Sequence, residues 1–165
     1  MIKEVNYYPQ YLIEETIFNE KYAVISITDS GKDEDGIAKI KGTEKILRLH
    51  FLDIEETSLN KDYTCFTEDI AKNLINFVEK LNKEKEEINV VVHCRMGASR
   101  SPAVALYINK LTNCEFPGYD NANTPNKLVL NILKNLSGLD IEIPEKKEES
   151  SFILLIPKIK IKWIS

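Results

Sequence analysis

The segment HCRMGASRS, residues 93–101, holds a cysteine and an arginine with five residues between them. Cys94 follows the apolar run Val90–Val92, which predicts a buried strand, and the sequence after Arg100 predicts a helix. The residues between them therefore form a strand-to-helix turn, whose backbone N–H groups lie at the positive end of a helix. Such a turn suits an anion, and the cysteine adds a nucleophile that simple anion binding does not require.

The loop has the residue types that a tetrahedral oxyanion requires. Gly97 permits a backbone angle that other residues resist, and small side chains follow it. The loop amides can then surround the anion, as in other anion-binding turns. Arg100 can bind two oxygens at once through its forked guanidinium. The candidate substrate-binding residues are Arg95, Met96, Gly97, Ala98, Ser99 and Arg100.

The same surroundings would activate the cysteine. Converging N–H dipoles and a guanidinium stabilise a thiolate, which lowers a cysteine pKa from ~8.5 into the range of ~3.5–7.5. A thiolate beneath a bound phosphate is a nucleophile aimed at phosphorus. The residues therefore predict phosphoryl transfer through Cys94. No Cys/His cluster has metal-ligand spacing, so we expect neither a metal nor another cofactor.

The pattern His93-Cys94-x5-Arg100-Ser101 resembles the signature of cysteine-dependent protein tyrosine and dual-specificity phosphatases. It is most similar to the small dual-specificity branch and its compact bacterial relatives, and the similarity extends over residues 20–136. The resemblance implies that Cys94 forms a cysteinyl-phosphate and that Arg100 and the loop amides hold the transferring group. It also implies that Ser101 steadies the departing thiolate and that His93 orients the loop and tunes the thiol.

The resemblance further implies a general acid upstream of the cysteine. A carboxylic acid must protonate the leaving oxygen and then, as a carboxylate, activate water. In the family, an aspartate just past a strand and before the long helix does this, and Asp53 has that position. Asp62 is the alternative, because it lies 32 residues before Cys94 whereas Asp53 lies 41 residues before it. We favour Asp53 for its context.

Strands and helices alternate along the chain, which predicts a single α/β domain with a mainly parallel central sheet flanked by helices. We assign residues 1–143 to a phosphatase-like catalytic domain and 144–165 to a charged linker with an apolar, strand-like tail. The period-two pattern of 152–164 favours an edge strand, with a self-association edge or a surface-seeking segment as alternatives. The expected strands are 2–8, 22–28, 45–52 and 90–92, and the expected helices are 10–18, 67–81, 101–111 and 124–136, the last capped by Thr124.

Composition narrows the function further. The chain has 165 residues, 43% hydrophobic and 29% charged, which is typical of a globular domain in solution. Its net charge of −4 disfavours a nucleic-acid partner. No apolar run approaches the ~20 residues that cross a membrane, and the N-terminus lacks a signal pattern. Three cysteines without a secretion signal favour the cytoplasm and reduced thiols.

The leading prediction is a metal-independent phosphatase for phosphotyrosine, and also phosphoserine and phosphothreonine, on a phosphorylated protein or a small phosphomonoester. A catalytically silent phosphate-binding module, a phosphoinositide or RNA 5′-phosphatase and a rhodanese-like sulfurtransferase are the alternatives. Met96 and Ala98 stand where similar phosphoinositide enzymes often carry lysines, and the acidic balance offers little for RNA. Cys65 and Cys114 are candidates to resolve an oxidised Cys94.

Overall fold

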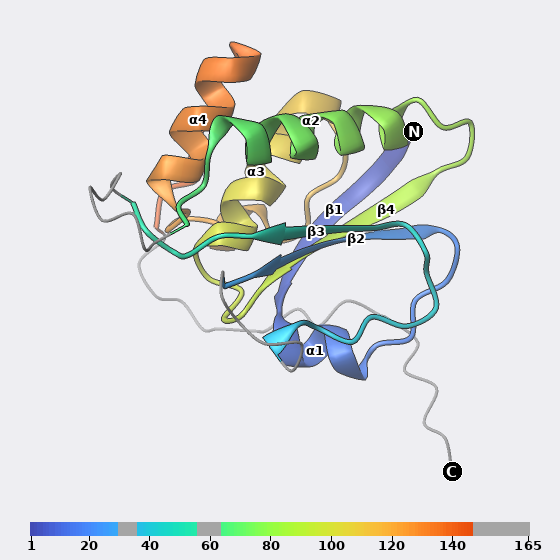
Figure 1. Ribbon diagram of the computed structural model, residues 1–165. Helices are drawn as coiled ribbons and strands as arrows, with labels where there is room; N and C mark the ends of the chain where they lie inside the picture. Colours follow the sequence, from blue (N-terminus) through green and yellow to red (C-terminus); the bar gives the residue numbers. More distant parts are fainter. Residues whose placement is uncertain (30–35, 56–63, 147–165) are drawn as a thin grey trace.

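The computed structural model describes residues 1–29, 36–55 and 64–146 (Figure 1). Its strands form one sheet in the order β1-β4-β2-β3, and every neighbouring pair is parallel. The predicted α/β class is therefore confirmed, and within the described residues the sheet is wholly parallel. Asp62 and the tail 152–164 lie outside the described residues. The elements are β1 (Ile2–Pro9), α1 (Gln10–Glu15), β2 (Tyr22–Thr28), β3 (Ile46–His50), α2 (Glu68–Asn82), β4 (Ile88–Cys94), α3 (Arg100–Thr112), η2 (Tyr119–Asn121) and α4 (Lys127–Ser137).

Helices cover the two faces of the sheet unequally. Helices α2, α3 and α4 lie on one face, where the larger core is found, and α1 lies on the other (Figure 1). Side chains of β4 enter the cores on the two faces alternately. Val90 and Val92 belong to the larger core, and Val91 belongs to the smaller one. Because β4 is covered on both faces and paired on both edges, its apolar run is continuous rather than alternating with polar residues.

Several element boundaries differ from those expected. Helix α1 ends at Glu15, so the expected helix over 10–18 is too long. Helix α4 is capped by Asn126 and not by Thr124, because the Asn126 side chain accepts a hydrogen bond from the Val129 amide at 3.0 Å. The Thr124 hydroxyl donates instead to the Ala98 carbonyl at 3.4 Å. None of the helices in the described ranges is long and apolar enough to cross a bilayer.

The parallel sheet brings four chain segments to one edge. Cys94 ends β4, Gln10 follows β1, Asp29 follows β2 and Asp53 lies just beyond β3. Because parallel strands all point the same way, the residues that follow them meet at the carboxyl edge, where open α/β sheets bind ligands. This edge is where the signature loop lies.

Candidate active site

The signature loop connects the last residue of β4 to the first turn of α3. Gly97 adopts φ +65°, a left-handed conformation that side chains rarely adopt. A Cβ at this position would lie 2.5 Å from the backbone nitrogen of Pro9. The Gln10 amide also donates to the Arg95 carbonyl at 3.3 Å. The end of β1 therefore packs against the loop so closely that only glycine fits at its centre.

The thiol of Cys94 lies at the base of this loop and is buried. Its Sγ lies 3.2 Å from the Ser101 hydroxyl in the first turn of α3. Burial opposes ionisation most strongly, but the side chain and backbone of Ser101, the charge of Arg100 and the backbone of Gly97 together outweigh it. The pKa of Cys94 is therefore lowered, which favours the thiolate that a nucleophile requires.

The guanidinium of Arg100 is fixed by two acceptors on a single nitrogen. Its Nη1 donates to the Asp29 carboxylate at 2.8 Å and to the Phe51 carbonyl at 2.7 Å. Its Nε is buried and has no hydrogen-bond partner among the described residues. An unsatisfied buried donor is uncommon in a native structure, and a catalytic role or a bound ion is one explanation for it. The Nε side of the guanidinium therefore remains available to an oxyanion.

Asp53 is held through one of its two carboxylate oxygens. Its Oδ1 accepts from the Ser99 hydroxyl and from the Asn126 amide, each at 2.7 Å. Its Oδ2 lies 4.0 Å from Nε of Arg100. The side chain is 41% exposed, so it lies at the mouth of the site rather than in the core. This arrangement orients Oδ2 beside the arginine that would hold an anion.

His93 lies behind the loop and is fully buried. Its Nε2 is 2.8 Å from the Ser26 hydroxyl, which Arg48 also contacts through Nη1 at 3.4 Å. Burial, followed by the positive charge of Arg48, lowers the pKa of His93 to about 4. His93 is therefore neutral at physiological pH, and its hydrogen bond to Ser26 joins β4 to β2.

The structure brings the predicted residues together in one place. Cys94, Arg100 and Ser101 share the loop and the first turn of α3, and Asp53 reaches them from the segment just beyond β3. Cys114 has a pKa that is raised, chiefly by burial, which disfavours its ionisation. Among the described residues, no group of three or more His, Cys, Asp or Glu side chains could hold a metal ion.

Sequence reasoning missed two residues of the site. Asp29 directly follows strand β2, and the residues that follow parallel strands meet at one edge of the sheet, so its position after a predicted strand was the signal that could have placed it beside the loop. Asn126 lies two residues after Thr124, which we expected to cap the helix, so no role was predicted for Asn126. It combines an N-cap, a bond to Asp53 and a bond to the Ile54 carbonyl at 3.3 Å.

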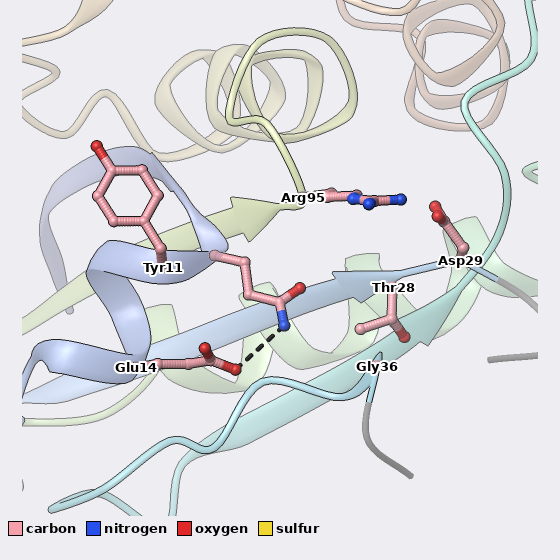
Figure 2. Close-up of a pocket in the computed structure, with 7 residues that line it drawn as sticks. Tyr11, Glu14, Thr28, Asp29, Gly36 and Arg95 are labelled. Atoms are coloured by element: carbon pink, nitrogen blue, oxygen red, sulfur yellow. Dashed lines mark hydrogen bonds between the residues drawn. The ribbon is translucent and has the colours of Figure 1, made fainter. Parts of the chain in front are cut away.

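A cavity of about 320 Å³ adjoins the loop on the α1 side. Figure 2 shows the Arg95 side chain extending from the end of β4 in the direction of Asp29, with Glu14 on the helix below. The Gln10 side-chain amide donates to Glu14 at 3.1 Å. Most of the side chains that line this cavity are therefore polar or charged. The lining residues are Gln10, Tyr11, Glu14, Thr28, Asp29, Gly36 and Arg95.

Neither the protein-family models nor the curated proteins compared with this chain gave a match, so any assignment of function rests on the site itself.

Proposed function

We propose that this protein is a metal-independent phosphatase that hydrolyses phosphotyrosine, and also phosphoserine and phosphothreonine, through a cysteinyl-phosphate intermediate. The observation that carries the proposal is the position of the Cys94 thiol. It lies 3.2 Å from Ser101, has a lowered pKa, and begins a loop that closes on a guanidinium whose Nε has no hydrogen-bond partner among the described residues. A buried thiol in an inert setting would have a raised pKa instead, as Cys114 does.

In the first step, the Cys94 thiolate attacks phosphorus, the S–P bond forms and the P–O bond to the leaving group breaks. Asp53, protonated on Oδ2, gives its proton to the leaving oxygen. The loop amides and the free side of the Arg100 guanidinium hold the equatorial phosphoryl oxygens, on which charge is spread in the transition state. The alcohol or phenol then departs and leaves a phosphorylated cysteine.

In the second step, water attacks the same phosphorus and gives a proton to the Asp53 carboxylate. The S–P bond breaks, inorganic phosphate forms and the thiolate is regenerated. The Ser101 hydroxyl stabilises the returning negative charge on Sγ, because a hydrogen bond to a charged group is stronger than one to a neutral group. The cycle therefore needs no redox change and no group from outside the chain except water.

The exposed rim of the loop supports activity on phosphate attached to proteins. Met96 is 74% exposed at the top of the loop, and Arg95 is also exposed. A phosphorylated residue therefore meets an open rim.

Hydrolysis of p-nitrophenyl phosphate in EDTA tests the proposal, with wild type compared with Cys94→Ser from about pH 4.5 to 8. We expect turnover by the wild type, none by the variant, and a phosphate adduct on Cys94 in rapid-quench mass spectrometry. A folded, reduced protein that binds phosphate without turnover would instead be a binding module. Transfer of sulfur from thiosulfate to cyanide would identify a sulfurtransferase.

A further inference from the structure

The carboxylate of Asp29 lies against the phosphate-binding guanidinium. Asp29 directly follows β2, its side chain is 20% exposed, and its Oδ1 lies 2.8 Å from Nη1 of Arg100, whose side chain is 5% exposed. We infer that Asp29 is a positioning residue that sets the orientation of Arg100 for the transferring phosphoryl group. This inference rests on the proposed function and adds a residue that the signature does not contain.

Arg100 is held through Nη1 of its guanidinium, whereas Nε has no hydrogen-bond partner among the described residues. Asp29 and the Phe51 carbonyl both accept from Nη1, at 2.8 and 2.7 Å. The Phe51 ring also lies beneath the group, with its centroid 5.9 Å from Cζ. A planar group held at one nitrogen by acceptors from two strand ends has little freedom to rotate. Asp29 therefore orients Arg100 and does not compete with a phosphate for Nε.

The alternative partner for Arg100 is the proposed general acid. Oδ2 of Asp53 already lies 4.0 Å from Nε, which is the limit of an ion pair. A buried guanidinium that loses its carboxylate is left with an uncompensated charge, so it moves toward another acceptor. Without Asp29, we expect Arg100 to close the gap to Asp53. That movement would occupy both the donor that holds phosphate and the oxygen that carries the proton.

Anion binding by Asp29 variants tests whether Asp29 positions Arg100. Binding becomes tighter if Arg100 stays in place and weaker if Arg100 moves. If Arg100 stayed in place, loss of a nearby negative charge would tighten binding of an anion. If Asp29 holds Arg100 in position, its loss weakens anion binding, because losing a hydrogen bond between charged groups costs about 10- to 100-fold in affinity. A residue that only stabilises the fold would lower the melting temperature and leave the affinity of the folded protein unchanged.

Isothermal titration calorimetry with tungstate tests this inference. The titrations measure binding in the Cys94→Ser variant, which lacks the nucleophile. This variant is used alone and combined with Asp29→Asn, Asp29→Glu or Asp140→Asn. Asp29→Glu keeps the charge but lengthens the side chain, so it displaces Arg100 in a protein that retains its ion pair. Asp140 has a 90% exposed side chain and serves as the matched control for a lost carboxylate.

We expect both Asp29 variants to bind tungstate about 10- to 100-fold more weakly and Asp140→Asn to bind as its parent does. The pH dependence of Cys94 alkylation by iodoacetamide, measured with the thiol intact, should move to higher pH in Asp29→Asn, because Arg100 has moved away. Unchanged or tighter tungstate binding by either folded Asp29 variant would overturn the inference. If the Cys94→Ser parent binds no tungstate, the phosphate site is itself wrong. If the wild type hydrolyses phosphate esters and Asp29→Asn does so equally well, only the inference fails.

Discussion

The side-chain amide of Asn126 donates to Oδ1 of Asp53 at 2.7 Å, while its own Oδ1 accepts from the Val129 amide at 3.0 Å. One buried side chain therefore caps α4 and holds the carboxylate at the mouth of the site. This contact ties the loop after β3 to a helix on the larger-core face of the sheet. The position of the proposed acid thus depends on a residue that lies behind it and outside the signature loop.

We expect Asn126→Ser to separate capping of α4 from positioning of Asp53. Serine is as good an N-cap as asparagine, so the melting temperature should fall only modestly. Serine lacks the side-chain amide that donates to Asp53, so kcat/KM on phenyl phosphate should fall by about tenfold, the value of one hydrogen bond to a charged group. Thermal unfolding and steady-state kinetics measure the two effects. A large loss of stability with normal activity would assign Asn126 to the cap alone.

We expect Asp53→Asn to lower kcat/KM on phenyl phosphate, a poor leaving group, by about 10²- to 10⁴-fold. The loss should be much smaller on 2,4-dinitrophenyl phosphate, whose leaving group needs no proton. Asp140→Asn is the control for the removed charge. Equal losses of Asp53→Asn on both esters would mean that Asp53 is not the acid, and the same leaving-group dependence in Asp62→Asn would transfer the role to that residue.

Ser101→Ala removes the hydroxyl that lies 3.2 Å from the Cys94 sulfur. Because this hydroxyl lowers the thiol pKa, we expect its loss to raise the pKa of Cys94. The midpoint of alkylation by iodoacetamide should then move to higher pH. Breakdown of the phosphorylated cysteine should slow by about tenfold or more, so the adduct should accumulate in rapid-quench mass spectrometry. An unchanged alkylation profile would contradict this prediction.

Gly97→Ala is expected to abolish most activity, because the added Cβ would meet the Pro9 nitrogen at 2.5 Å and φ is +65°. The left-handed conformation alone costs about 1–2 kcal/mol for an L-residue. Gly138→Ala is the matched control, since Gly138 has φ +70° and a Cβ added there would have no neighbouring atom within 4 Å. We expect similar conformational costs but normal activity from Gly138→Ala. Comparable activity in the two variants would show that the β1–loop contact does not matter.

The lowered pKa of His93 predicts a stability that depends on pH. The folded pKa is about 4, against the usual 6.5, so the folded protein binds this proton less readily than the unfolded chain. The contribution of His93 to the free energy of unfolding is therefore complete above about pH 6.5. It falls by about 3 kcal/mol as the pH drops toward 4. Urea unfolding should show a shallower fall between pH 6.5 and 4 for His93→Asn than for the wild type. Parallel curves would contradict the prediction.

Local signals in the sequence were sufficient to predict the strand-to-helix loop and the position of Cys94 in it. The spacing of Cys94 and Arg100, the apolar run before them and Gly97 between them all act over a few residues, so the pattern can be read directly. Strand β2 was predicted with its correct bounds, Tyr22–Thr28, because it is a buried apolar run ended by polar residues. The class of the sheet followed from the alternation of strands and helices.

What the sequence did not reveal depends on contacts between distant segments. The pairing of Asp29 with Arg100 joins residues 71 positions apart, and the Asn126–Asp53 contact joins residues 73 apart. No periodicity carries such information. Thr124 is a good capping residue in isolation, but its hydroxyl donates to the Ala98 carbonyl, and Asn126 therefore caps the helix. Tertiary contacts overrode the local preference.

The strand order has a consequence for when the surroundings of Cys94 form during folding. Strand β4 separates β1 from β2, and its first residue, Ile88, pairs with Ile2 near the start of the chain. Neither β1 nor the β2–β3 pair can join the other until β4 inserts between them, and such long-range pairing is slow. The lowered pKa of Cys94 depends on the assembled loop, so an incompletely folded chain carries an ordinary thiol. The surroundings that lower the pKa of Cys94 therefore form only when the sheet is complete.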